Sequence, residues 1–147
     1  MFVVDTNVLV YAADAQAAEH ARCRALVESW RRRSSAWYLS WGICYEFLRV
    51  VTHPRVFRRP WPVGEARRFL AALQESPGLG ILLPTERHGR VLAEVIEEVP
   101  QLSGNLLHDA ATAVLMREHG IRRICTRDTA FHRFPFLEPI DPLTVEP

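Results

Sequence analysis

Lysine is absent from this sequence, and all 18 basic residues are arginine. Codon usage in a GC-rich genome accounts for such a bias, although the arginine fork also suits bidentate phosphate contacts. We interpret the arginine clusters first as solvated faces and second as contacts to a phosphate backbone: Arg31–Arg33, Arg55 with Arg58 and Arg59, and Arg67 with Arg68. The 17 acidic residues leave a net charge of +1, so the chain as a whole has no basic excess.

Cysteines are few, and long apolar runs are missing. The three cysteines, Cys23, Cys44 and Cys125, are scattered and odd in number, which suits buried free thiols in a reducing cytoplasm better than a disulfide framework or a zinc site. No apolar run approaches the roughly 18 residues that a membrane span requires. The first residues form a strand pattern without a basic region, so we expect neither a signal peptide nor a membrane partner.

The 147 residues, 48% of them hydrophobic, are expected to form one domain over residues 1–147. Short apolar stretches predict strands at 2–4, 37–39, 81–83, 123–126 and 139–141. Helical spacing and end signals predict helices at 7–13, 17–33, 41–52, 62–76, 86–99 and 106–119. This alternation predicts an α/β fold in which helices flank a central parallel β-sheet.

Two of the predicted strands lead into a carboxylate. Asp5 follows Phe2-Val3-Val4, and Asp128 follows the strand that ends near Thr126. The carboxyl ends of parallel strands lie at one edge of the sheet, where ligands bind in open α/β folds. The two aspartates are therefore expected to form an acidic pocket. The alternative for Asp5 and Thr6 is a purely local role, as the cap of the helix that follows.

Two helices each carry a further carboxylate at an unexpected position. Glu46 lies at the edge of an apolar stripe, where it either faces the same pocket or forms a surface pair with Arg49. Asp109 lies in a helix that is apolar nearly all round, with no basic residue three or four positions away. Stabilisation of the helix dipole is the local explanation for Asp109. A buried carboxylate without a partner is costly, so we expect a cation beside it.

Four carboxylates in one pocket repel one another, at about 4 kcal/mol for a pair 4 Å apart in an effective dielectric near 20. Such a cluster persists when cations fill it, and an all-oxygen set of ligands suits Mg²⁺ or Mn²⁺. No grouping of histidine and cysteine favours zinc. His108, beside Asp109, is interpreted as a packing or supporting residue rather than a ligand.

In chain order, Asp5-Thr6-Asn7, Glu46, Asp109 and Thr126-Arg127-Asp128 followed by Phe131 resemble the motifs of PIN-domain ribonucleases. The segments 46–57 and 105–109 further resemble VapC-type toxins of toxin–antitoxin pairs. The resemblance implies a PIN-like domain, a homodimer, an antitoxin protein as partner and RNA as substrate.

Site roles follow from the same resemblance. It implies that Asp5, Glu46, Asp109 and Asp128 hold Mg²⁺ or Mn²⁺, which activates water for phosphodiester hydrolysis. Thr6, Asn7 and Thr126 are then the residues expected to hydrogen-bond the carboxylates and orient them.

Two other functions remain open at this point. One is a catalytically silent PIN-like binding module, against which the intact acidic residues argue. The other is a different Mg²⁺-dependent phosphohydrolase, such as a haloacid-dehalogenase-like phosphatase. That chemistry needs a second aspartate two residues after the first, where this chain has Asn7, and a lysine, which it lacks.

The loop at residues 55–62 is a candidate docking surface for the antitoxin. Phe57 and Trp61 are of the types that anchor protein interfaces, and a partner helix could lie between the helices that the loop joins. An arginine or lysine of the partner would then reach into the acidic pocket. The alternative is that Phe57 and Trp61 close the core beneath the loop.

Overall fold

The computed structural model describes residues 1–145, so residues 146–147 of the predicted domain lie outside the description. Its sheet has five strands in the order β3-β2-β1-β4-β5, and every neighbouring pair is parallel. The strands are β1 (Val3–Val4), β2 (Trp37–Ser40), β3 (Leu79–Leu82), β4 (Arg123–Cys125) and β5 (Glu138–Ile140). The predicted parallel α/β fold is confirmed.

The strand order places β1 at the centre of the sheet. The chain runs outward from β1 to β2 and β3, then returns to the other side of β1 to add β4 and β5. Val3 is consequently paired with Tyr38 of β2 and with Ile124 of β4. This reversal of strand order creates a crevice beyond the carboxyl ends of β1 and β4, which is the usual ligand position in such sheets.

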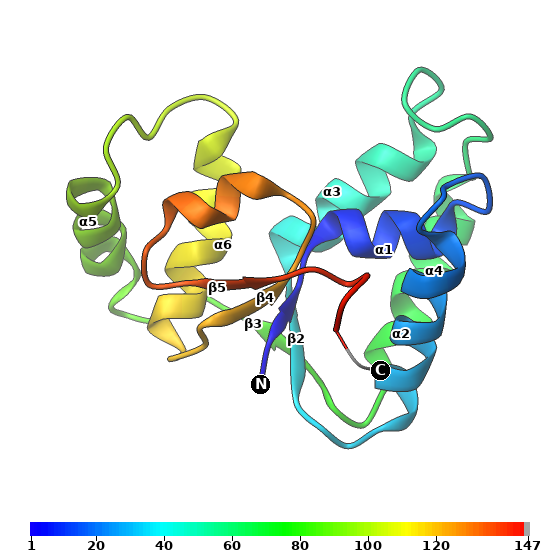
Figure 1. Ribbon diagram of the computed structural model, residues 1–147, viewed down its shortest axis with the longest axis horizontal. Coiled ribbons are helices and arrows are strands. Elements are labelled where there is room, and N and C mark those ends of the chain that lie inside the picture. Colours follow the sequence, from blue (N-terminus) through cyan, green and yellow to red (C-terminus); the bar gives the residue numbers. More distant parts are fainter. Residues whose placement is uncertain (146–147) are drawn as a thin grey trace.

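Six α-helices and one 3₁₀ helix connect the strands within residues 1–145. They are α1 (Thr6–Ala13), α2 (His20–Arg32), α3 (Trp41–Thr52), α4 (Val63–Gln74), α5 (His88–Glu98), α6 (Leu106–Glu118) and η1 (Thr129–Arg133). In the view of Figure 1, α1 to α4 lie to the right of the strands, whereas α5 and α6 lie to the left. No helix of the described chain is long and apolar enough to cross a membrane.

The core is built on the short central strand. Val3 and Val4 have no exposed surface, and Trp37 of β2 and Ile124 of β4 are equally inaccessible beside them. All three cysteines are buried and unpaired, as predicted. A strand covered on both faces needs apolar residues at every position, which explains why β1 shows no alternation of polar and apolar residues.

Most element boundaries differ from the predictions by one or two residues, and the start of α2 differs by three. β3 begins at Leu79 rather than at residue 81, because Gly80 pairs with Tyr38 in a space where a Cβ atom would lie 2.7 Å from the tyrosine ring. The helix α2 begins at His20 rather than at residue 17, after a turn closed by the bond from His20 N to Ala17 O. η1 was not predicted at all.

Glu118, at the end of α6, is a buried carboxylate that sequence reasoning did not single out. Its side chain accepts bonds from Thr85 N at 2.9 Å and Thr85 Oγ1 at 2.5 Å, and His88 Nδ1 lies 2.6 Å from Oε2. These contacts tie the segment before α5 to the end of α6. Every partner is more than 25 positions away in the chain, and so no local pattern indicates the pairing.

The aromatic residues of the α3–α4 loop point into the protein. Phe57 is only 5% exposed, and its ring lies 6.4 Å from that of the half-buried Trp61. Trp61 also packs edge-on against Phe47 and Phe69, at 6.3 and 5.8 Å. The structure supports the alternative for Phe57, whose buried ring closes the core beneath the loop, whereas Trp61 is only half-buried.

The buried position of Phe57 has a measurable consequence. Phe57→Ala is expected to lower the free energy of unfolding by about 3–5 kcal/mol, because it removes a ring and leaves a cavity. Val56→Ala is the matched control, since Val56 is 58% exposed, and its effect should stay within about 0.5 kcal/mol. Urea unfolding of both variants makes the comparison, and equal effects would contradict the assignment of Phe57 to the core.

Candidate active site

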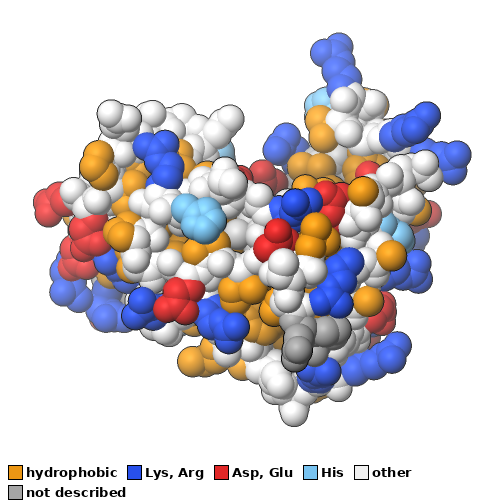
Figure 2. All heavy atoms as spheres, in the orientation of Figure 1, with side chains coloured by type: hydrophobic (Ala, Val, Ile, Leu, Met, Phe, Trp, Pro, Cys, Tyr) orange, Lys and Arg blue, Asp and Glu red, His pale blue; other side chains and the backbone are white. Residues whose placement is uncertain are grey.

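A pocket of about 670 Å³ opens at the carboxyl edge of the sheet and is lined by all four predicted acidic residues, Asp5, Glu46, Asp109 and Asp128. They come from the end of β1, from α3, from α6 and from the segment after β4. Figure 2 shows the hollow as a notch at the top of the molecule, with acidic atoms at its floor. The sequence-based prediction that these four residues share one pocket is thus met by the geometry.

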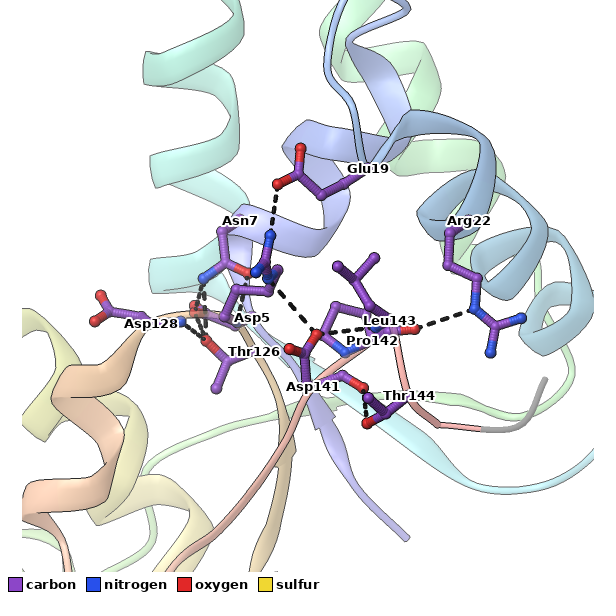
Figure 3. Close-up of polar contacts among 11 residues, drawn as sticks. Asp5, Asn7, Glu19, Arg22, Thr126, Asp128, Asp141, Pro142, Leu143 and Thr144 are labelled. Atoms are coloured by element: carbon purple, nitrogen blue, oxygen red, sulfur yellow. Dashed lines mark hydrogen bonds and ion pairs between the residues drawn. The ribbon is translucent and has the colours of Figure 1, made fainter.

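Asp5 is the most enclosed of the four, with 8% of its surface exposed. Its Oδ1 accepts a bond from Thr6 N at 2.7 Å, which caps α1. Its Oδ2 accepts bonds from Asn7 Nδ2 at 2.5 Å and Thr126 Oγ1 at 2.6 Å (Figure 3). The local capping role and the pocket position are therefore both real, and the carboxylate is held in one orientation.

The hydroxyl of Thr126 connects the two strand ends. It donates to Asp5 Oδ2, and it accepts from Asn7 Nδ2 at 3.0 Å and from Asp128 N at 2.9 Å. A hydroxyl has one donor and two acceptor positions, so its bonding capacity is filled. Thr126 is 3% exposed, and the loop that carries Asp128 is fixed to Asp5 through this buried group.

Glu46 and Asp128 are exposed acids that engage local donors. Glu46 Oε2 accepts a bond from Thr6 Oγ1 at 3.1 Å, and Oε1 lies 3.6 Å from Arg49. The surface pair with Arg49 thus exists alongside the pocket position. Asp128 Oδ1 accepts from Ala130 N at 2.8 Å and caps η1. The predicted supporting residues Thr6, Asn7 and Thr126 each contact one of the acids.

Asp109 differs from the other three acidic residues. It is half-buried in the first turn of α6, and its carboxylate has no hydrogen-bond or ion-pair partner among residues 1–145. Burial raises its pKa to about 7, and repulsion from Asp128, Asp5 and Glu46 adds to the rise. A carboxyl group in this position is poised to release a proton when a cation approaches.

Asp5 is perturbed in the same direction. Burial raises the pKa of Asp5 to about 6, and the negative charges of Glu46 and Asp128 contribute, although the bonds from Thr126 and Thr6 oppose the rise. Two of the four carboxyl groups therefore titrate well above the ordinary range near 4. Repulsion inside the pocket is the shared cause in addition to burial.

The carboxylate oxygens of this pocket and their negative charge suit a hard divalent cation. Four carboxylates supply oxygen ligands, and Asp109 has no partner in the described part of the chain that a cation would need to displace. As they stand, however, no three Asp, Glu, His or Cys side chains of residues 1–145 are close enough together to hold a metal ion. Glu46 is engaged by Thr6 of α1 and by Arg49 of its own helix, and Asp128 is engaged by Ala130 of η1.

Several pocket residues were not predicted, and one was left without a role. Asn105, Tyr45 and Arg49 line the pocket together with His108, which is exposed at its wall. The spacing of Tyr45 and Arg49, four residues apart on α3, was the available signal, because such residues share one face of a helix. His108 makes no hydrogen bond that would fix a supporting role within residues 1–145.

Arg127, the middle residue of the Thr-x-Asp motif, pairs with residues outside the pocket. Its Nη1 lies 2.6 Å from Glu19 Oε1, and its Nε lies 3.6 Å from Asp141 Oδ1. Its backbone N–H donates to Asn7 Oδ1 at 3.2 Å. The loop carrying Thr126 and Asp128 is thereby tied to the turn before α2, and Figure 3 shows Glu19 and Asp141 on either side of this connection.

Comparison with known proteins gives one consistent result. The family model described as PIN domain matches residues 2–137. Ribonuclease VapC43 of Mycobacterium tuberculosis is 34% identical over 143 residues, covering 97% of this chain and 96% of that protein. Ribonuclease VapC48 of the same organism is 30% identical over 140 residues, covering 95% and 96%.

Solved structures share the fold. VapC20 of Mycobacterium tuberculosis, described as a sarcin-ricin loop cleaving toxin, superposes with a TM-score of 0.64 at 19% identity, covering 90% of this chain and 93% of that one. A chain of VapBC2 from Rickettsia felis, bound to a DNA fragment from their promoter, has a TM-score of 0.64 at 17% identity, covering 95% and 96%.

The raised pKa values predict how the stability of the metal-free protein changes with pH. The folded chain holds more protons than the unfolded chain between the ordinary aspartate pKa of 3.8 and the folded pKa of about 7 for Asp109. The free energy of unfolding should therefore fall as the pH rises through this window. Asp109→Asn cannot ionise, so the variant should lose part of that slope.

Urea unfolding in chelator, between about pH 4 and pH 8, measures the effect. Glu97→Gln is the control, because Glu97 is an exposed carboxylate on α5 outside the pocket. A slope that Asp109→Asn leaves unchanged would show that Asp109 does not titrate as described.

Proposed function

The chain belongs to the PIN domain family as a VapC-type ribonuclease, and from this premise we propose that it hydrolyses RNA phosphodiester bonds with Mg²⁺ or Mn²⁺. The observation that carries the proposal is the pocket itself, in which four elements each deliver one carboxylate. No side chain within residues 1–145 neutralises Asp109, whose pKa is raised to about 7 by burial and by the other three acids. Such a concentration of negative charge is a costly arrangement unless a cation completes it.

The residues divide into those that would hold the cation and those that position them. Asp5, Glu46, Asp109 and Asp128 would bind it, and when bound it would supply the Lewis acidity that activates water and offsets charge on the phosphate. Thr126 holds Asp5 and the backbone of Asp128 in fixed relation through its filled hydroxyl. Asp5 is immobile and buried, whereas Asp128 and Glu46 are exposed at the mouth, where the RNA backbone would enter.

Protons and cations compete for the same oxygens in this pocket. Asp109 is about half protonated near neutral pH in the metal-free protein, since burial and its acidic neighbours raise its pKa to about 7. Cation affinity should therefore increase with pH through the range in which Asp5 and Asp109 ionise. The negative charge of the pocket, the burial of Asp109 and the lack of a partner for its carboxylate among residues 1–145 all favour a divalent cation as the ligand.

RNA cleavage is expected to require Mg²⁺ or Mn²⁺ and to stop in chelator. Asp5→Asn, Glu46→Gln, Asp109→Asn and Asp128→Asn should each lose more activity than the roughly 10–100-fold that loss of a supporting residue costs, while Thr126→Val should fall within that range. Glu97→Gln should cleave at the normal rate, because Glu97 lies outside the pocket.

Cleavage of a labelled RNA by purified protein, with and without chelator, tests these expectations. Full activity in chelator, or in Asp5→Asn, would rule out the metal-dependent reaction. Metal-independent RNA binding without cleavage would instead support a silent binding module, and hydrolysis of small phosphomonoesters would support another phosphohydrolase.

We further propose that the chain acts in the cytoplasm as a homodimeric toxin under the control of an antitoxin protein. The VapC relationship supports the antitoxin, and the three buried free thiols suit a reducing compartment. The acidic pocket offers a means of inhibition, because a guanidinium or ammonium of the partner would form charge-assisted bonds with carboxylates that repel one another. Phe57 is not available to anchor this partner, because its ring is part of the core.

Expression of the chain alone in a bacterial host is expected to arrest growth, because the proposed activity destroys cellular RNA. Asp5→Asn should abolish the arrest at the same protein level, and co-expression of the antitoxin encoded beside the gene should relieve it. Growth curves with immunoblots measure both effects. Arrest that persists in Asp5→Asn would show that toxicity does not come from the pocket.

A further inference from the structure

Two aromatic side chains are exposed on the same face of α3. Trp41 is 50% exposed and Tyr45 is 69% exposed, whereas every other phenylalanine, tyrosine and tryptophan within residues 1–145 is buried or half-buried. The two residues are one helical turn apart, and their ring centroids lie 6.5 Å from each other with the planes inclined at 49°. The rings therefore form one small surface, and most of it is open to solvent.

This surface adjoins the acidic pocket. Tyr45 lines the pocket and directly precedes Glu46, one of the four carboxylates. Arg49 lies one further turn along α3, lines the pocket as well, and has a side chain that is 62% exposed. Trp41, Tyr45 and Arg49 thus follow one another at four-residue intervals along one face of α3, and Tyr45 and Arg49 of this stripe line the pocket.

The charge of the pocket limits how RNA can be held there. Four carboxylates repel the phosphates of an approaching strand, and the net charge of +1 gives little overall attraction. Contacts that do not depend on phosphate charge would therefore add to the binding of RNA at this pocket. Stacking of unpaired bases on aromatic rings is such a contact, and it is available only where a ring is accessible.

We propose that Trp41 and Tyr45 form a platform on which unpaired RNA bases stack, beside the phosphate that enters the pocket. This proposal rests on the ribonuclease function proposed above and names the residues that would hold the bases of its substrate. The substrate is RNA with unstacked bases at the cleavage site, as in a single strand or a loop, because bases inside a continuous duplex present no free face to a ring.

Equilibrium binding tests the platform without any need for turnover. The probe is a short, fluorescently labelled single-stranded oligoribonucleotide, measured by anisotropy in chelator against the full chain. Trp41→Ala and Tyr45→Ala should each raise the Kd by about tenfold, within the range of a base–aromatic stack. Trp41→Phe and Tyr45→Phe should stay within about twofold, since phenylalanine keeps a stacking face.

Further variants separate stacking from other effects of the substitutions. Tyr45→Leu should bind as weakly as Tyr45→Ala, because leucine retains apolar area but has no ring. Ile96→Ala is the matched control, since Ile96 is 51% exposed on α5 and lies outside the pocket. The ratio of variant to normal Kd should not change between about 50 and 200 mM salt, because phosphate contacts carry the salt dependence of binding.

Three other outcomes of the binding, sedimentation and cleavage measurements each decide one part of the proposal. An unchanged Kd in the Trp41→Ala Tyr45→Ala double variant overturns the platform, even if the protein cleaves RNA. A change of oligomeric state in that variant, seen by sedimentation, also overturns it and assigns the rings to a contact with a second copy. Ring-dependent binding by a protein that does not cleave RNA in Mg²⁺ supports the platform and rejects the ribonuclease function.

Discussion

The pairing of β1 with strands on both of its sides is the constraint on which the rest of the structure depends. Val3 contributes to the ladders with β2 and with β4, so a strand of two residues holds the sheet together. Parallel pairing brings the ends of these strands to one edge. Asp5 and Thr126 meet there as a direct result of strand register, and α3 and α6 add Glu46 and Asp109 to the same crevice.

The site is arranged at the expense of local stability. Asp5 and Asp109 have raised pKa values because burial and neighbouring acids disfavour their charged forms. The surrounding structure holds Asp5 in place nonetheless through the filled hydroxyl of Thr126, and the ion pairs of Arg127 with Glu19 and Asp141 fix the loop that carries Thr126. Rigid support beneath unfavourable charge is typical of binding sites that are prepared for a ligand.

Sequence reasoning succeeded where local signals decide the outcome. Helix ends at Ser40 and Gly120, the buried strand at Val3–Val4 and the ordered set of acids can all be read from neighbouring residues. It failed where a distant contact decides. Phe57 turns inward against Trp61, whose ring in turn contacts Phe47 of α3 and Phe69 of α4. Glu118 is buried because Thr85 and His88 reach it from the start of α5 and the segment before it. Tyr45 was missed because a polar pocket wall on α3 has no sequence signature apart from its four-residue spacing.

The bond between Thr126 and Asp5 joins residues 121 positions apart. A chain emerging from the ribosome presents Asp5 first, but the partner that orients this carboxylate and the β4 strand that flanks it arrive only near the end of synthesis. Contacts of such long range also form late in folding, because closing a large loop costs entropy before any contact repays it. The pocket can therefore be complete only after nearly the whole chain has been made, so the site is still unfinished while the ribosome is adding its last residues.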